Sequence, residues 1–197
     1  MESLTNADTN LFLWLNGLHA PWLDRVMVLL TDMWVWIPIY LLLLYLVIKN
    51  YGKRSVWLLL ALGLVILCSD QLSAHVCKPL FHRLRPCFNP DLEGLVHLPK
   101  GLAGGHYGFV SSHAANTFAV AAFLTCALKG NHRWIGWMLF GWAFVSSYTR
   151  IYIGVHYPGD ILAGALLGLL IGLIIWKLFD LILKHHLNRR ADLDAPQ

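Results

Sequence analysis

The chain has 197 residues, of which 57% are hydrophobic and only 13% are charged, and its mean hydropathy is +0.57. This composition excludes a water-soluble globular domain, in which about a quarter of the residues carry a charge. The formal net charge is +4, and we expect no nucleic-acid partner. The expected fold class is all-α: a polytopic transmembrane helix bundle that forms one membrane-embedded domain over residues 1–197.

Residues 1–32 are apolar, but polar or helix-breaking residues interrupt them at short intervals. These interruptions are Asn16, His19, Pro21, Asp24 and Arg25. Because neither half is long enough to cross a bilayer, we expect an interfacial helix followed by a short, partly inserted helix, with a sixth transmembrane helix as the alternative. The segment lacks the basic start and the small-residue cleavage site of a signal peptide, so we expect it to be retained.

Five apolar runs further along the chain have about the length of a transmembrane helix, which needs roughly 17 to 25 residues to cross a hydrocarbon core of about 30 Å. They cover residues 33–48, 55–76, 113–129, 134–151 and 158–179. In the last run, Gly164, Gly168 and Gly172 recur every four residues. This spacing places them on one helix face, where a second helix can approach closely.

The lysines and arginines in short connections set the expected orientation. They follow the first span, lie between the third and fourth spans, and recur toward the tail 180–197; the residues are Lys49, Lys53, Arg54, Lys129, Arg133, Lys177, Lys184, Arg189 and Arg190. If the spans alternate, these segments share one side, which we expect to be cytoplasmic. The outer side holds the loop region 77–112 and the connection 149–158, which are also basic. Cations there go against the positive-inside rule and indicate anion binding.

Two polar blocks on the outer side flank the long loop. Lys78 and Arg85 are seven residues apart, which is two helical turns, and Pro86 stops any helix. On a helix that continued that far, the two cations would face the same way. Ser111 or Ser112 is suited to cap the next helix, whose N-terminal N–H groups then attract an anion.

The third block connects the fourth and fifth spans. Arg150 ends the fourth span, His156 follows six residues later, and Asp160 follows after four more. If Pro158 lies in the first turn of the fifth span, His156 and Asp160 share a helix face. A histidine oriented by an aspartate is a nucleophile or a base, and a second histidine, His113, can protonate a leaving oxygen. With the three cations, these groups indicate phosphate chemistry.

The three blocks resemble the signature of the type 2 phosphatidic acid phosphatase (PAP2) superfamily. Its members are integral-membrane lipid phosphatases that share their site with vanadium-dependent haloperoxidases. The resemblance covers residues 55 to 180, about two thirds of the chain. The chain departs from the usual pattern in the middle block, which reads Val110-Ser111-Ser112-His113 instead of Pro-Ser-Gly-His, and at Thr149, where a serine is common.

The resemblance implies a role for each of these residues. His156 would attack phosphorus to form a phosphohistidine, Asp160 would hold its ring, and His113 would protonate the leaving oxygen and later activate water. The groups that would hold the phosphate and its pentacoordinate transition state are Lys78, Arg85, Arg150, Ser111 and Ser112. The implied reaction requires no metal ion and no other cofactor.

We therefore expect a phosphatase of the bacterial cytoplasmic membrane, with its site at the periplasmic face and a membrane lipid phosphate as its substrate. Undecaprenyl diphosphate is the favoured substrate, with phosphatidylglycerophosphate, phosphatidate and lipid A as alternatives. A transporter and a non-catalytic binder of anionic lipids are the competing classes. The charges gather at one face rather than along the spans, which argues against a transporter. The spacing of His156 and Asp160 argues against a passive binder. No oligomeric state is predicted.

Several further residues keep two interpretations. Arg83 is a fourth phosphate ligand or a solvated loop cation, and Asp70 either orients Lys78 or makes a helix-packing hydrogen bond. The cysteines have no CxxC spacing, which disfavours a metal or redox site, and we expect Cys77 and Cys87 not to pair. The loop 87–110 is long and glycine-rich, and we expect it to select the substrate.

Overall fold

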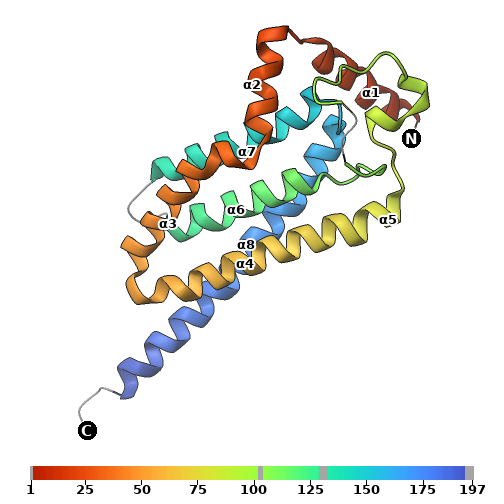
Figure 1. Ribbon diagram of the computed structural model, residues 1–197. Helices are drawn as coiled ribbons and strands as arrows, with labels where there is room; N and C mark the ends of the chain where they lie inside the picture. Colours follow the sequence, from red (N-terminus) through yellow and green to blue (C-terminus); the bar gives the residue numbers. More distant parts are fainter. Residues whose placement is uncertain (1, 102–103, 129–132, 194–197) are drawn as a thin grey trace.

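A computed structural model describes residues 2–101, 104–128 and 133–193 of the chain. Regular structure within these ranges is helical, apart from one isolated bridge between Leu84 and Tyr107 (Figure 1). The α-helices are α1 (Glu2–Gly17), α2 (Pro21–Thr31), α3 (Ile37–Tyr51), α4 (Ser55–Gln71), α5 (Lys78–Phe81), α6 (Ser112–Leu128), α7 (Arg133–Tyr152) and α8 (Pro158–Leu193). Between them lie the short turns η1 (Met33–Trp36), η2 (Gly52–Arg54), η4 (Pro86–Phe88) and η5 (Pro90–Leu92), and the π-helical segment η3 (Leu72–Cys77). The all-α prediction is confirmed.

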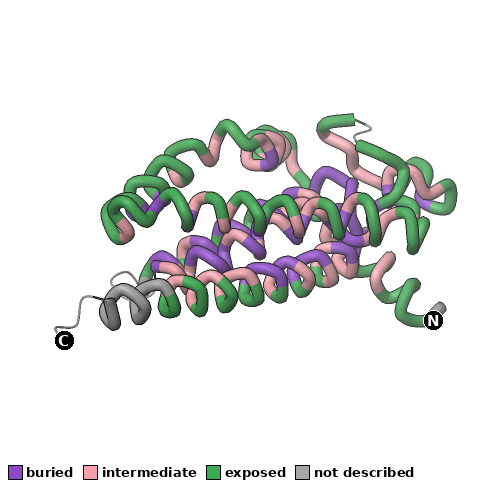
Figure 2. Tube along the Cα trace, turned by 90° about the horizontal axis from the view of Figure 1, so that it is seen from below, coloured by how far each residue is buried: buried purple, intermediate pink, exposed green. Residues whose placement is uncertain are grey.

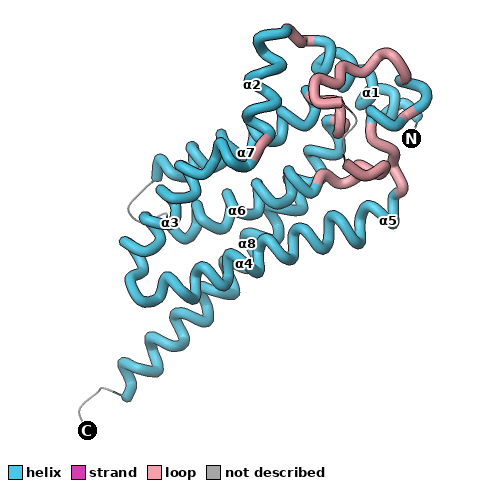
Figure 3. The backbone as a smooth tube through the Cα atoms, viewed as in Figure 1, coloured by secondary structure: helices cyan, strands magenta, loops and turns pink. Residues whose placement is uncertain are grey.

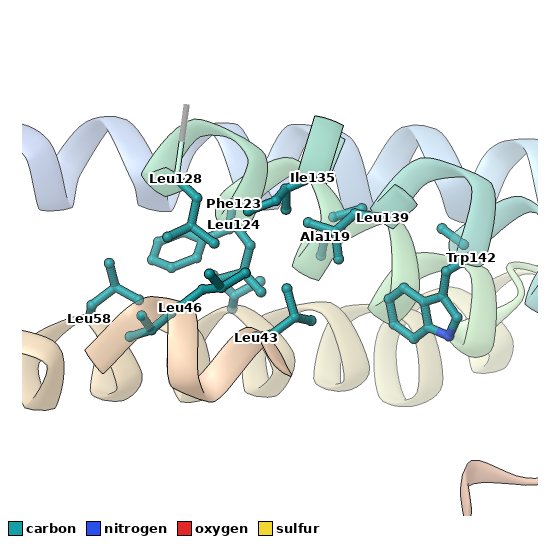
Figure 4. Packing of buried hydrophobic residues seen from close by; sticks show 14 residues of the cluster. Leu43, Leu46, Leu58, Ala119, Phe123, Leu124, Leu128, Ile135, Leu139 and Trp142 are labelled. Carbon is teal, nitrogen blue, oxygen red and sulfur yellow. The ribbon is translucent and has the colours of Figure 1, made fainter. Parts of the chain in front are cut away.

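Helix α6 lies at the centre of the bundle and packs against α8, α7 and α4. Figure 4 shows side chains of α3, α4, α6 and α7 meeting in the largest buried cluster, among them Leu46, Leu58, Phe123 and Trp142. Burial follows the inner faces of the helices, and the outward faces are exposed (Figure 2). Those outward faces carry large apolar residues such as Leu67. An exposed apolar surface of this extent suits lipid rather than water.

Two continuous helical stretches have the length and composition to cross a membrane, Met33–Phe81 and Pro158–His185, and Ser112–Leu128 is a shorter apolar helix. The first stretch turns back at Gly52, whose φ of 52° favours glycine, so α3 and α4 are separate limbs that meet near this turn (Figure 1). The structure therefore has the apolar helices of a membrane bundle, and the count of five spans stays a prediction. Helix α8 continues through the predicted tail to Leu193. Lys129 and the side chains of Arg133, Arg189 and Arg190 lie outside the described residues.

The glycine stripe of α8 packs against α6, as predicted. A Cβ atom at Gly164, Gly168 or Gly172 would overlap with backbone carbonyl groups at the start of α6 and along it, those of Ser111, Ala115 and Ala119. The two helix backbones are therefore in direct contact. At the outer end of this contact, the N–H of Ser111 donates to the carbonyl of Asp160 at 3.1 Å. The stripe thus holds the N-termini of α6 and α8 together, and the second and third polar blocks with them.

Helices α1 and α2 lie at the end of the bundle where the irregular backbone gathers (Figure 3). They have 16 and 11 residues, fewer than the roughly 17 that a span needs, which favours the interfacial alternative over a sixth span. Helix α1 packs on α7 and α8, and α2 packs on α7. The buried Asn16 ties α1 in place, because its amide donates to the carbonyls of Ile151 and Tyr152 at 3.2 and 2.8 Å. Both carbonyls lie in the last turn of α7, where helix carbonyls lack intrahelical partners; that of Ile151 also accepts the N–H of Gly154 at 3.0 Å.

Candidate active site

The third block is built around the start of α8, with one correction to the prediction. Pro158 is the first residue of α8 and Asp160 lies in its first turn. His156 precedes the helix, so the two residues do not share a helix face. Instead the Asp160 carboxylate reaches back, accepts the N–H of Tyr157 at 3.0 Å, and places Oδ2 3.4 Å from Nδ1 of His156. The bond to Tyr157 is one half of a capping box, so the helix start itself orients this carboxylate.

The His156 side chain is almost completely buried and its ring is uncharged at neutral pH. Burial, together with the charges of Arg85 and Arg150, lowers the pKa of His156 to about 4, against the opposing effect of Asp160. A carboxylate only accepts hydrogen bonds, so the hydrogen-bond pattern assigns the proton to Nδ1, facing Asp160. Nε2 is then left with its lone pair, as a nucleophile requires.

Of the three predicted cations, two lie near His156 and the third lies near those two. Arg85 and Arg150 both lie close enough to act electrostatically on its ring. Lys78 is within the same range of Arg85, Arg150 and Asp160. Three like charges in a partly buried space repel one another, and an anion bound among them would relieve that repulsion.

Arg85 reaches the site from a loop, because the helix does not continue from Lys78 to Arg85 and the condition for the two cations to share a helix face is not met. Helix α5 ends at Phe81, because His82 adopts the left-handed conformation with a φ of 48°. The chain beyond it is held by a backbone bond from the N–H of Arg85 to the carbonyl of His106 at 2.9 Å. The long loop therefore contributes directly to the position of this cation.

Arg150 is oriented by α2, a helix that the three-block pattern does not include. Its Nη1 donates to the hydroxyl of Thr31 at 2.8 Å. Its Nε is buried and has no partner among the described residues. A buried donor without an acceptor is destabilising by about 1–3 kcal/mol, and a phosphate oxygen would satisfy it. Nothing in the spacing of Thr31 along the sequence indicates this contact.

The second block begins α6 as predicted. The hydroxyl of Ser111 accepts the N–H of Ala114 at 3.4 Å and caps the helix, and the hydroxyl of Ser112 is buried without a partner in the described part of the chain. His113 lies in the first turn, with Nε2 2.7 Å from the hydroxyl of Ser146 on α7. His113 is also close enough to His156 to interact electrostatically. Ser146 was not predicted, because one hydroxyl in an apolar run is no signal.

Gly108 packs directly on His156 and Asp160. A Cβ atom there would lie 3.0 Å from Oδ2 of Asp160 and 3.5 Å from Nδ1 of His156. Gly108→Ala should therefore displace these groups by a few tenths of an ångström and lower kcat by roughly tenfold, less than the roughly 10²-fold loss that a displacement of about 1 Å causes in an active site. Gly105→Ala is the matched control, because its Cβ would meet nothing within 4 Å. Phosphate release from a lipid phosphate by both variants is the measurement; equal activity would contradict this geometry.

The residues left open by the sequence are now placed. Arg83 is not an unpaired loop cation, because it forms ion pairs with Asp8 and Asp160 at 2.6 and 2.7 Å. Asp70 accepts the side-chain amide of Asn116 at 3.3 Å, which confirms the helix-packing alternative. Its charge also acts on Lys78, and the alternative that it orients this lysine stays a prediction. Cys77 and Cys87 are not joined by a disulfide in this structure.

Comparisons with known proteins agree with this geometry. A family model described as the PAP2 superfamily matches residues 54–183. The chain is 39% identical over its whole length to a lipid A 4'-phosphatase of Bacteroides thetaiotaomicron, 85% of which is covered. It is 31% identical over 82% of its length to an undecaprenyl-diphosphatase of Sulfolobus acidocaldarius, 73% of which is covered.

The fold matches a solved structure as well. The crystal structure of a transmembrane PAP2-type phosphatidylglycerolphosphate phosphatase from Bacillus subtilis aligns with a TM-score of 0.63 at 26% identity. The alignment covers 91% of this chain and 87% of that one. The chain therefore belongs to the PAP2 superfamily of membrane phosphatases that hydrolyse lipid phosphates.

Proposed function

We propose that this enzyme removes a phosphate group from a lipid phosphate at the periplasmic face of the bacterial cytoplasmic membrane, through a phosphohistidine on His156. The observation that carries the proposal is the environment of His156. Its ring is neutral and buried, its Nδ1 faces Asp160, and Arg85 and Arg150 act on it from nearby. A neutral imidazole beside a binding site for an anion is suited to attack phosphorus.

The first step forms a bond between Nε2 of His156 and phosphorus and breaks the bond from phosphorus to the lipid oxygen. His113 gives its proton to that oxygen, so the lipid leaves as an alcohol or a lipid monophosphate. Asp160 stabilises the charge that develops on the His156 ring. In the second step His113 takes a proton from water, the water oxygen attacks phosphorus, and the bond to His156 breaks. Inorganic phosphate leaves and His156 is neutral again.

The cations stabilise the pentacoordinate phosphorus of both steps. Lys78, Arg85 and Arg150 neutralise the non-bridging oxygens, and the hydroxyls of Ser111 and Ser112 supply further donors. These groups are fixed before substrate arrives, so they do not reorganise during the reaction. They neutralise the charge on the phosphate oxygens, as a magnesium ion does in many other phosphoryl transfers.

For the substrate, we propose a lipid A-type phosphate in place of the undecaprenyl diphosphate favoured from the sequence alone. The support is the relative named as a lipid A 4'-phosphatase, which matches the whole chain at 39% identity. The relative named as an undecaprenyl-diphosphatase is less similar, at 31% over 82% of the chain. The three polar blocks bind the phosphate in either case and do not discriminate between the lipids.

A panel of lipid phosphates tests the proposed function. The detergent-solubilised enzyme receives lipid A, undecaprenyl diphosphate, phosphatidylglycerophosphate and phosphatidate in turn, and released inorganic phosphate is measured. We expect kcat/KM to be highest for lipid A by at least about tenfold, or about 1.4 kcal/mol. Activity should persist in excess EDTA and be inhibited by vanadate, which mimics pentacoordinate phosphorus. If EDTA abolished the activity and a divalent metal ion restored it, the proposed metal-independent mechanism would be contradicted.

For the topology, we propose five spans with α1 and α2 at the periplasmic interface and the C-terminus in the cytoplasm. The support is the gathering of Lys and Arg after α3 and near the end of α8. In a variant without native cysteines, Gly101→Cys in the long loop should react with an impermeant thiol reagent added to intact cells. Lys53→Cys, in the turn after α3, should not react until the membrane is opened. Reversed labelling would overturn the orientation.

A further inference from the structure

A chain of ion pairs joins the N-terminal helix to the catalytic carboxylate. Arg83 donates through Nη1 to Oδ1 of Asp160 at 2.7 Å and through Nη2 to Oδ2 of Asp8 at 2.6 Å. Asp8 lies in α1, 75 residues from Arg83 along the chain. Its other oxygen accepts the N–H of Gly159 at 2.8 Å, next to Asp160. Asp8, Arg83 and Asp160 therefore form one connected network around the start of α8.

The two oxygens of Asp160 have separate partners. Oδ1 receives Arg83, and Oδ2 faces Nδ1 of His156 and the N–H of Tyr157. Because the carboxylate is planar, a bond that fixes Oδ1 also fixes the direction of Oδ2. The side chain of Asp160 is 0% exposed, so its charge has lost its water and depends on Arg83 for neutralisation. Arg83 is thus positioned to set the orientation of the His156 ring through Asp160.

Arg83 is itself held from several sides. Its guanidinium lies over the Tyr157 ring at 4.1 Å, and its carbonyl accepts the N–H of Gly108 at 2.8 Å. Asp8 is packed just as closely, because a Cβ atom on Gly159 would lie 2.7 Å from its Oδ2. An anionic side chain at this place also faces the positive end of the α8 dipole. The ion pair between Asp8 and Arg83 is therefore held in one geometry.

We propose that Asp8 and Arg83 are positioning residues of the reaction, which hold the Asp160 carboxylate and through it the nucleophile His156. This inference rests on the proposed role of His156. We assign Arg83 to positioning rather than to phosphate binding, because its guanidinium pairs with two carboxylates, one of them fully buried. The N-terminal helix, which lies outside the residues matched by the family model, thereby becomes part of the catalytic apparatus.

Three variants separate a positioning role from other roles. Arg83→Gln removes the bridge, and we expect kcat and the rate of phosphoenzyme formation to fall by roughly 10²-fold while KM stays within about threefold. Asp8→Asn keeps an oxygen for the N–H of Gly159 and weakens only the ion pair, so we expect a fall of roughly tenfold. Arg83→Lys keeps the charge but lacks the fork that reaches both carboxylates, so it should not restore the rate. Lys184→Gln, which breaks an exposed ion pair with Asp180 within α8, is the control and should change kcat by less than about twofold.

The double variant Asp8→Asn/Arg83→Gln provides a coupling test. If Asp8 acts through Arg83, the double variant should be no slower than Arg83→Gln alone. A raised KM with unchanged kcat in Arg83→Gln would make Arg83 a substrate ligand and overturn the inference, as would full activity in Arg83→Lys. If Arg83→Gln does not fold, Asp8→Asn decides, and wild-type kcat in that folded variant would also overturn it.

A parallel assay of His156→Ala keeps the two proposals apart. If His156→Ala still forms a phosphoenzyme, the proposed function itself fails. If His156→Ala is inactive while Arg83→Gln and Asp8→Asn behave as wild type, only the positioning inference fails.

Discussion

His156→Ala is expected to form no phosphoenzyme with any substrate, whatever its leaving group, and to lose turnover by at least about 10⁴-fold. The substitution removes the atom that bonds phosphorus, so no change of substrate can compensate. The phosphate site itself should survive, because Lys78, Arg85 and Arg150 come from other elements of the fold. Turnover of a lipid phosphate and of p-nitrophenyl phosphate by the detergent-solubilised variant is the measurement.

His75→Ala is the matched control for the loss of an imidazole. His75 is an exposed histidine in the π-helical segment before Lys78. This variant should retain normal turnover. Substantial activity in His156→Ala with either ester would mean that the nucleophile has been assigned to the wrong residue.

His113→Ala is expected to lose activity in proportion to how much the leaving oxygen needs a proton. With an alkyl lipid phosphate the loss should be about 10² to 10⁴-fold, the usual contribution of a general acid. With p-nitrophenyl phosphate the loss of the first step should be much smaller, because that phenolate leaves without protonation. The rate of phosphoenzyme formation, measured by rapid quench with both esters, gives the two losses.

The same variant tests whether one histidine serves both steps. Water activation also passes through His113, so the variant should accumulate the phosphoenzyme instead of turning over. An equal loss of the first step for the two leaving groups would contradict the assignment of His113 as the acid. Ser146→Ala, which removes the hydroxyl 2.7 Å from Nε2 of His113, should show the same dependence on the leaving group but a smaller loss.

The parts of the site that lie close together in sequence could be predicted from spacing. His156 lies six residues after Arg150 and four residues before Asp160. This short spacing keeps the three groups at the junction of α7 and α8, whatever the exact ends of the two helices. The serine cap of α6 was predictable for the same reason, since capping is decided by local backbone chemistry. The glycine stripe of α8 likewise indicated the close approach of a second helix.

The backbone conformation between Lys78 and Arg85 could not be predicted. Their spacing of two turns would place them on one face only if the helix continued to Arg85, and the left-handed conformation of His82 ends it earlier. Histidine is not a strong helix breaker, so the sequence carries little signal there. The convergence of the two cations was nevertheless correct, because the loop returns Arg85 to the site by pairing with residues near His106.

Contacts between segments far apart in the sequence could not be predicted. Thr31 supports Arg150 from 119 residues away, and Asp8 supports Arg83 from 75 residues away. Neither residue belongs to a periodic pattern or a short motif, so nothing local distinguishes it from an ordinary polar residue. The N-terminal helices were expected as interfacial elements, and their contribution to the site follows only from the three-dimensional packing of α1 and α2 on α7 and α8.

The most direct test of the account is the location of the phosphoryl group in His113→Ala. The variant is mixed with a radioactive phosphate ester, quenched and digested at alkaline pH, where phosphohistidine survives, and the labelled peptide is sequenced by mass spectrometry. The account predicts label on the peptide that contains His156, lost on acid treatment and absent when His156→Ala is added. Acid-stable label, or label on any other residue, would contradict it.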